Sequence, residues 1–325
     1  MKKIILRVAK LPILNYFFIL YIKHKSKEKK LSYGIENPDK VFYVIGQKER
    51  TGGLWWIVNK VVMHLAYADD NGYIPVVDFK NFWTQYHTDG ELGNVNVWEK
   101  FFCQPMGYNL ESIAKSKNII ISDKKPAPSL DYLMGNTDFY DNPDRLAYFQ
   151  KIFKKYIRFC EDSKSYLEDK KTKIIPKGSK VLGVLCRGTD YLLKRPKDHP
   201  IQPNPQEVIE HAEQVMREYK CDFVFIATED ADILDMFKER FGDYLLYVDQ
   251  NRIRQEEMAN ANLVVDVTSK SQKDKYIMGL DYLLSTYILS SCSCFIGGRT
   301  GGTKGVLLMQ EGFEYCYIYN LGFYE

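Results

Sequence analysis

The chain has 325 residues, of which 45% are hydrophobic, 14% aromatic and 27% charged, as in an ordinary globular protein rather than a disordered or fibrous one. This length predicts two domains of about 150 residues each, with a cleft between them. Residues 1–34 contain nine Lys or Arg and one acid, so the remaining residues carry about −5 although the whole chain carries +3. That balance argues against nucleic acid as the main partner, because binding a phosphate backbone needs a basic folded surface.

The N-terminal segment, residues 1–34, begins with Lys2 and Lys3 and continues into a largely apolar run, residues 11–22. The run is too short to span a bilayer, and no small-residue cleavage site follows it. Apolar and aromatic residues bracketed by lysines predict a helix that lies on an anionic membrane surface, at the cytoplasmic face. The alternative is a first helix packed on the body, with a lysine-rich solvated tail.

In the first half, residues 41–45 predict a strand and residues 54–68 a helix, with Gly52 and Gly53 in the turn between them. Residues 73–78 predict a buried strand. A strand, a glycine turn, a helix and a second strand make the first half of a Rossmann-like unit. Gly52 and Gly53 are candidates for a donor-binding turn, although two adjacent glycines are weak evidence.

Residues 79–175 are less regular, with a predicted strand at 118–122 and a helical stretch at 144–167. We expect acceptor-side residues within 78–98, where aromatic side chains could stack on sugar rings or equally belong to the core. The polar stretch 168–177 predicts the domain boundary. The expected domains are therefore residues 35–172 and residues 173–325.

Strands alternate with helices in the second half, which predicts an α/β protein with parallel sheets and right-handed crossovers. The predicted strands are 181–186, 222–227, 244–248 and 294–296, and the predicted helices are 206–219, 230–241, 274–290 and one that begins near Thr303.

The loop after strand 181–186 carries Arg187, Gly188, Thr189 and Asp190. In parallel sheets, ligands bind outside the carboxyl ends of the strands. An Arg placed there can donate two N–H bonds to a diphosphate, Gly188 lets the backbone approach, and Asp190 can orient the Arg or bind a hydroxyl. The alternative is an ordinary turn with a surface Arg.

The long loop 192–205 holds four of the 12 prolines and the pair Asp198 and His199. Loops of this length in compact domains are usually functional or disordered. Either side chain could accept a proton from an acceptor hydroxyl, His199 more readily because histidine titrates near neutral pH. Alternatively, His199 stabilises the loop.

Two further strand ends are candidates for the same site. Thr228 and Asp230 precede a helix, which they could cap while also lining a ligand site. After the last predicted strand, four glycines within six residues suggest a backbone that comes close to phosphate, or a tight structural turn. The spacing is not that of a Walker loop. The candidates in this glycine-rich loop are Arg299, Thr300, Gly301, Gly302, Thr303 and Lys304.

Seven cysteines, odd in number and mostly set in apolar runs, predict reduced core residues and a cytoplasmic location. Cys292 and Cys294 form a C-x-C pair rather than C-x-x-C, and the five histidines lie far apart. We therefore expect no metal site.

Four stretches, taken in order, resemble the fucosyltransferase superfamily, most closely the α-1,6-fucosyltransferases that make core fucose or decorate nodulation factors. The resemblance covers about residues 41–80 and 180–310 and lies in GGLWWIVNKVVMHLAYADDNGYIPVVD, GVLCRGTDY with a following HPI, VFIATEDADIL, and GLDYLLSTYILSSCSCFI.

The resemblance implies a GT-B type fold of two Rossmann-like domains, the second of which binds the nucleotide sugar. It also implies GDP-fucose as donor substrate, inversion at the sugar carbon, and neither cofactor nor catalytic metal. Carried over, Arg187 would contact the diphosphate, Asp281 would lie in the nucleotide pocket, and Thr228 and Asp230 would line the donor site. Without a metal, Arg and backbone N–H groups must stabilise the charge of the leaving GDP.

The sequence departs from the family pattern at three positions. Leu185 replaces a His, and Gly188 replaces a second Arg, so the diphosphate would depend on Arg187 with help from Arg299 or Lys304. Arg195 replaces a carboxylate, which leaves Asp198 or His199 as the candidate base. These departures keep three hypotheses open.

The first hypothesis is an enzyme that transfers fucose to a glycan or lipid-linked oligosaccharide for a cell-surface polysaccharide. The second is the same fold with another nucleotide sugar, because Leu185 alters a position that resembles a purine contact. The third is a catalytically inactive protein that binds sugar or nucleotide.

Overall fold

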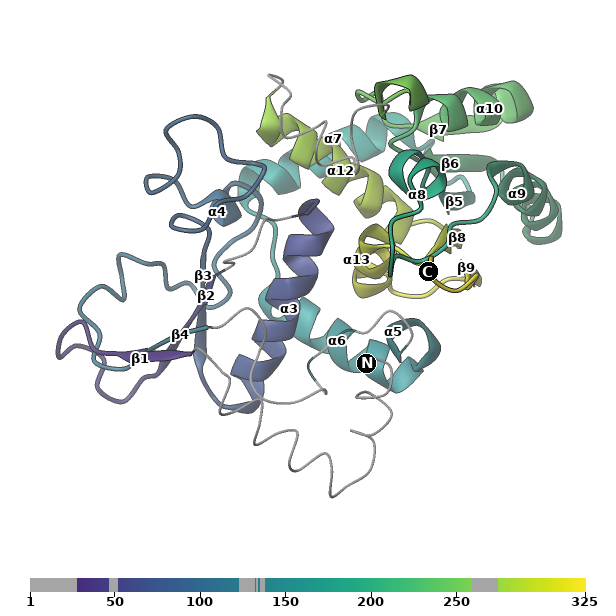
Figure 1. The fold of residues 1–325 in the computed structure, drawn as a ribbon. Helices are drawn as coiled ribbons and strands as arrows, with labels where there is room; N and C mark the ends of the chain where they lie inside the picture. Colours follow the sequence, from purple (N-terminus) through teal and green to yellow (C-terminus); the bar gives the residue numbers. More distant parts are fainter. Residues whose placement is uncertain (1–27, 47–51, 123–131, 133, 135–137, 259–273) are drawn as a thin grey trace.

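The computed structural model describes residues 28–46, 52–122, 132, 134, 138–258 and 274–325, and the predicted membrane-surface helix at 11–22 lies outside these residues. Two sheets, each with its own helices, lie at opposite sides of the molecule (Figure 1). The predicted α/β class with two mainly parallel sheets is confirmed. None of the described helices is long and apolar enough to cross a membrane.

The first sheet has the strand order β1-β4-β2-β3. Its strands are β1 (Lys29–Leu31), β2 (Phe42–Gly46), β3 (Ile74–Asp78) and β4 (Ile119–Ile121). β2 pairs in parallel with β3 and β4, whereas β1 runs antiparallel to β4 at the edge. The helices of this half are α3 (Leu54–Asp70), α4 (Val97–Phe101), α5 (Asp138–Asp141), α6 (Pro143–Tyr156) and α7 (Glu161–Ile174).

The second sheet is parallel throughout, in the order β7-β6-β5-β8-β9. Its strands are β5 (Val181–Leu185), β6 (Phe223–Ala227), β7 (Leu245–Tyr247), β8 (Cys294–Gly298) and β9 (Tyr315–Tyr319). Its helices are α8 (Thr189–Leu193), α9 (Pro205–Tyr219), α10 (Ala231–Phe241), α12 (Lys275–Ser290) and α13 (Gly301–Met309), with 3-10 turns η2 (Gly242–Tyr244) and η3 (Gln255–Met258).

Alternate residues of β5 face two different helical layers. Leu182 and Val184 pack in a cluster with α9 and α10, and Val181 and Leu185 pack in a cluster with α12 and α13. Because both faces are covered, the strand is apolar at every position. The chain builds outward from β5 to β7 and then returns to add β8 on the other side, so the strand order reverses between β5 and β8.

The two halves share one hydrophobic core, in which α3 packs on α12 and α13. Trp55 of α3 is fully buried, and its Nε1 donates a hydrogen bond to Thr286 Oγ1 of α12 at 2.7 Å. Its ring lies so close to α13 that a Cβ on Gly305 would overlap it. Gly305 therefore serves the packing of the two halves.

Three expectations differ from the structure in detail. The helical stretch 144–167 is two helices, because residues 157–160 leave the helix and bond to residues 101–103. The polar stretch 168–177, where the domain boundary was expected, is mostly the end of α7, which packs on α12, and the boundary itself stays a prediction. β9 was not predicted, although its sequence YCYIY is typical of a strand.

Candidate functional site

Two loops flank the point where the strand order of the second sheet reverses. One follows β5 and carries Arg187, and the other follows β8 and carries Arg299. In doubly wound sheets, ligands bind outside the carboxyl ends of the strands at such a reversal. The candidate site is therefore this edge of the sheet.

The loop after β5 is held by two acidic residues at the end of β6. The Gly188 N–H and the Thr189 hydroxyl donate to Glu229 Oε1, at 3.0 and 2.9 Å, and Arg187 Nε lies 3.5 Å from the same oxygen. Thr189 N–H donates to Asp230 Oδ2 at 3.0 Å. The guanidinium of Arg187, with 22% of its side chain exposed, lies over the ring of Tyr191. Arg187 thus points its charge to the edge of the sheet on a fixed loop.

The side chain of Asp230 comes close to the backbone at Gly188, where the sequence predicted the close approach of a diphosphate. That side chain is fully buried, and a Cβ on Gly188 would overlap it. Asp230 Oδ1 also caps α10, because it accepts from the N–H groups of Asp232 and Ile233, and Thr228 Oγ1 accepts from the Asp230 N–H. The capping role expected of Asp230 is confirmed, whereas a donor contact by Thr228 or Asp230 stays a prediction. The side chain of Asp190 lies outside the described part of the structure.

Tyr191 connects Arg187 to His199, because the ring of His199 lies edge-on to Tyr191 at 5.5 Å between centroids. His199 Nδ1 is 3.0 Å from the Lys197 carbonyl, an acceptor, so the proton of the neutral ring is on Nδ1 and Nε2 is the basic nitrogen. The backbone of Asp198 and His199 bonds to Tyr324, which pins the loop. The side chain of Asp198 is exposed.

The loop after β8 opens α13. Thr300 Oγ1 accepts the Thr303 N–H at 3.1 Å as the N-cap, and Thr303 Oγ1 donates to the Gly298 carbonyl at 2.5 Å. The first N–H groups of a helix have no partner within it, so they point their dipoles beyond the helix end. Gly301 and Gly302 begin this helix at the strand reversal.

Arg299, on this loop, and Lys304, near the start of α13, contact the first half of the chain. Arg299 is only 3% exposed, and its Nη2 binds both carboxylate oxygens of Asp141 at 2.7 and 2.8 Å. Lys304 Nζ donates to the Met134 carbonyl at 2.9 Å and lies over the ring of Phe139. Both residues were expected near the donor diphosphate, and in this structure they hold the β8 loop to the first half.

Tyr282 of α12 lies near a glycine candidate from each half, Gly53 and Gly302. A Cβ on Gly53, at the start of α3, would lie 3.6 Å from its ring, and a Cβ on Gly302 would lie 2.9 Å from its hydroxyl. Burial raises the pKa of Tyr282 to about 12, while the nearby Arg187 lowers it. The N-cap of α3 is Gly53, without a side-chain cap. The starts of two helices therefore lie beside one phenol, and Arg187 is near enough for its charge to act on that phenol.

Asp281 is half-buried and bonded within the protein, and sequence reasoning missed a cation of the same half, Arg252. The Asp281 carboxylate accepts the Tyr166 hydroxyl at 2.7 Å. Burial raises its pKa, while that hydrogen bond and, less strongly, the charges of Lys170 and Arg252 lower it. Arg252 donates to the carbonyls of Thr228 and Val248, at 3.2 and 2.8 Å, across the ends of β6 and β7. Arg252 lies in an irregular stretch without a strand end or glycine turn before it, so no pattern marked it.

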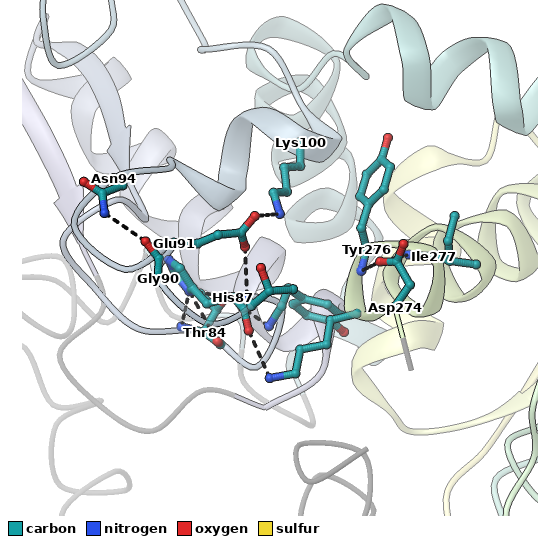
Figure 2. A network of polar contacts seen from close by, with 12 residues as sticks. Thr84, His87, Gly90, Glu91, Asn94, Lys100, Asp274, Tyr276 and Ile277 are labelled. Carbon is teal, nitrogen blue, oxygen red and sulfur yellow. Dashed lines mark hydrogen bonds and ion pairs between the residues drawn. The ribbon is translucent and has the colours of Figure 1, made fainter. Parts of the chain in front are cut away.

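The aromatic residues in the expected acceptor segment are largely core. Phe79, Tyr86 and Trp98 are buried, whereas Trp83 is 38% exposed. Figure 2 shows the polar contacts of this segment, in which Glu91 pairs with Lys100 and His87 bonds to Thr84. Lys275, at the start of α12, donates to the His87 carbonyl at 3.0 Å, which ties the segment to the second half.

A surface hollow of about 580 Å³ lies at the amino-end side of the second sheet, away from these loops. It contains neither a cation nor a helix N-terminus, because its lining is Met216, Cys221, Asp222, Phe223 and Tyr244. The chemistry of the carboxyl edge makes that edge the better candidate for an anionic ligand.

The fold and the site define an α/β protein with a cation and two helix N-termini at the strand reversal. No protein-family model matches the sequence, and no curated protein matches it. Solved structures of NodZ, an α-1,6-fucosyltransferase, and of POFUT1 are similar to the chain. NodZ soaked with GDP-fucose has 16% identity, with 83% of this chain and 93% of that chain covered, at a TM-score of 0.47. POFUT1 in complex with GDP-fucose has 11% identity, with 87% and 99% covered, at 0.49.

Proposed function

We propose that this chain is a glycosyltransferase that uses a nucleotide-diphosphate sugar, with the diphosphate at the strand reversal. The observation that carries the proposal is the convergence of Arg187 and the starts of α3 and α13 around Tyr282. A diphosphate carries the charge that helix N-termini and a guanidinium attract. When the sugar leaves, these groups stabilise the charge that develops on the nucleotide.

GDP-fucose is the proposed donor, on the strength of the four stretches that resemble the fucosyltransferase superfamily. The nucleoside would lie toward Asp281 and toward Arg252, which bonds across the ends of β6 and β7. Arg299 and Lys304 would act on the diphosphate mainly by holding α13 in place. Thr300 and Thr303 order the first turn of that helix.

His199 is the proposed general base. Its Nε2 is the basic nitrogen, and Tyr191 places the ring beside Arg187. Inverting transfer requires a proton acceptor at the incoming hydroxyl, across the sugar carbon from the leaving diphosphate, and the Tyr191 ring separates His199 from Arg187 in this way. His199→Gln should lower turnover about 100-fold or more while nucleotide binding remains. If turnover persists and Asp198→Asn abolishes it, the base is Asp198.

The proposed acceptor is a glycan or lipid-linked oligosaccharide for a cell-surface polysaccharide, used at the cytoplasmic face of a membrane. The support is residues 1–27, which contain seven Lys or Arg and no acid. A basic segment with an apolar run binds anionic membrane surfaces. Deletion of residues 1–27 should weaken co-sedimentation with vesicles that contain phosphatidylserine.

A nucleotide panel tests the donor directly. A bound nucleotide raises the melting temperature by mass action, so GDP should raise it more than UDP, CDP or ADP at equal concentration. A clear preference for UDP would contradict the fucosyl assignment and favour the same fold with another nucleotide sugar, a reading that Leu185 keeps open.

A second candidate function is a catalytically inactive protein that binds nucleotide or sugar. The observation that favours it is that Glu229 and Asp230 already accept the N–H groups of Gly188 and Thr189. The release of GDP from GDP-fucose separates the two candidates. Equal, low release by the native chain and by Arg187→Ala supports the inactive protein.

A further inference from the structure

The first sheet presents an apolar patch at its outer edge. Leu31, Tyr33 and Ile35 are 39%, 51% and 88% exposed. Figure 1 shows β1, which ends at Leu31, at the far side of this sheet from the second half. Exposed apolar side chains scattered singly need no explanation, whereas a group of them marks an interaction surface.

The patch is built on hydrogen-bonded backbone. Tyr33 N–H donates to the Ser116 carbonyl and Glu36 N–H to the Lys115 carbonyl, both at 3.0 Å, and Lys117 N–H donates to the Glu36 carbonyl at 2.9 Å. Residues 33–36 are therefore held against residues 115–117. The ordered backbone presents Tyr33 and Ile35 outward at a fixed place.

Lysines surround the three apolar side chains. Lys29, Lys30, Lys115 and Lys117 are exposed, and none of them forms an ion pair with a described residue. Of the acids on the same stretches, Glu28 is half-buried and accepts the Tyr43 hydroxyl, and Glu111 pairs with Lys80. Glu36 and Asp39 are exposed, so the four lysines still outnumber the remaining acids. Residues 1–27, with seven Lys or Arg and no acid, directly precede this region in the sequence. The charge of this edge is complementary to an anionic surface.

We propose that this patch, made of Leu31, Tyr33, Ile35, Lys29, Lys30, Lys115 and Lys117, docks on an anionic lipid bilayer. Tyr and Ile side chains suit the interface, and lysines reach the headgroups while their stems stay against apolar surface. The inference rests on the proposed membrane association of residues 1–27 and adds a second, folded contact. Two contacts fix the orientation of the first half, and one contact alone does not.

The test measures binding of the full chain to vesicles of phosphatidylcholine with phosphatidylserine, and to phosphatidylcholine alone. Lys115→Gln with Lys117→Gln should lower the partition coefficient roughly 10- to 30-fold, because each lysine near an anionic surface contributes about five-fold. Ile35→Ser should lower it about five-fold. The matched controls, Lys164→Gln with Lys177→Gln and Tyr244→Ser, change exposed residues elsewhere and should leave it within about two-fold.

A chain that lacks residues 1–27 separates the two contacts. It should keep binding that depends on phosphatidylserine, and Lys115→Gln with Lys117→Gln should abolish that binding. The proposal is overturned if patch variants bind the vesicles like the native chain in both backgrounds. It is also overturned if the chain without residues 1–27 binds a protein partner but not the vesicles. If the deletion changes nothing while patch variants weaken binding, the N-terminal proposal fails and the patch stands. Melting curves show whether each variant folds. The shift in melting temperature that GDP causes tests the donor proposal independently of membrane binding.

Discussion

The loops after β5 and β8 lie at the same edge of one sheet but are held by different parts of the chain. The β5 loop bonds to Glu229 and Asp230, within its own half. The β8 loop bonds to the first half, because Asp141 binds Arg299 and the Tyr140 hydroxyl donates to the Thr300 carbonyl. The β5 loop holds Arg187 at the edge of the sheet through contacts within its own half. The β8 loop and its contacts with residues 140 and 141 join the two halves, and we call this region the β8 joint.

This difference separates the expected effects of mutation. A change in the β5 loop should alter chemistry and leave stability nearly intact. A change in the β8 joint should reduce stability first and nucleotide binding as a consequence, because α13 begins at the joint. Four substitutions test this distinction.

Trp55→Ala should have the largest effect, a loss of about 3 to 5 kcal/mol in the free energy of unfolding. The indole fills the space between α3 and α13 and donates to Thr286 Oγ1, so its removal leaves a cavity in the joint and breaks this hydrogen bond, while the Thr286 hydroxyl keeps its bond to the Leu283 carbonyl. Urea unfolding measures the loss. Trp56→Ala, which removes a half-buried ring from the next position of α3, is the control and should cost clearly less. Equal losses would mean that the joint is not where α3 stabilises the fold.

Lys304→Met tests the joint through pH. Burial, together with the smaller effect of nearby Lys60, lowers the pKa of Lys304 from 10.5 to about 8. Because the folded pKa lies below the unfolded one, the unfolded chain binds more protons between these values, so the native chain gains stability as pH rises from about 8 to 10.5.

The gain should approach about 3 kcal/mol and be absent from Lys304→Met. Unfolding free energies at several pH values, subtracted between the native chain and the variant, isolate it from other titrating groups. Lys177→Met, at an exposed lysine, should show the slope of the native chain. If the difference in unfolding free energy between the native chain and Lys304→Met stays constant from pH 8 to 10.5, the pKa of Lys304 is not lowered by burial.

Sequence reasoning found the fold because apolar strands and amphipathic helices alternate with clear periods, as in β5, α9 and β6. It also found Arg187, since a polar residue directly after a buried strand marks the carboxyl edge. It missed Asp141, because the Arg299 pair joins residues 158 positions apart, and Arg252, because an irregular stretch has no period. The glycines after β8 indicated a close approach, and in the structure a Cβ on Gly298 would overlap Gln202 and a Cβ on Gly302 would lie 2.9 Å from the Tyr282 hydroxyl. The approach of phosphate to this loop stays a prediction.

Arg187→Ala tests the β5 loop. Release of GDP from GDP-fucose, with or without acceptor, should fall on the order of 100-fold, because a cation that stabilises the leaving group is lost. The melting temperature without nucleotide should change little, since the ion pair of Arg187 with Glu229 is long and its contact with the Tyr191 ring is partly exposed. Arg195→Ala, an exposed Arg further along the same segment, should keep the native rate. An equal fall in both variants would remove Arg187 from the site.

Asp141→Asn should have the smallest effect, a loss of about 1 to 2 kcal/mol. Removing the charge opposite a buried Arg often costs more, but Asp141 is 57% exposed and the amide oxygen still accepts one hydrogen bond from Arg299. Asp39→Asn, at an exposed acid without a bonded partner among the described residues, is the control.

The decisive comparison is the shift in melting temperature that GDP causes. If the joint positions α13, Asp141→Asn reduces the shift that GDP causes, although Asp141 lies on α5 in the other half. In the same case, Arg187→Ala reduces turnover more than stability. If Asp141→Asn lowers stability and leaves the GDP shift intact, the β8 loop joins the halves without serving the donor site, and the two loops have separate functions.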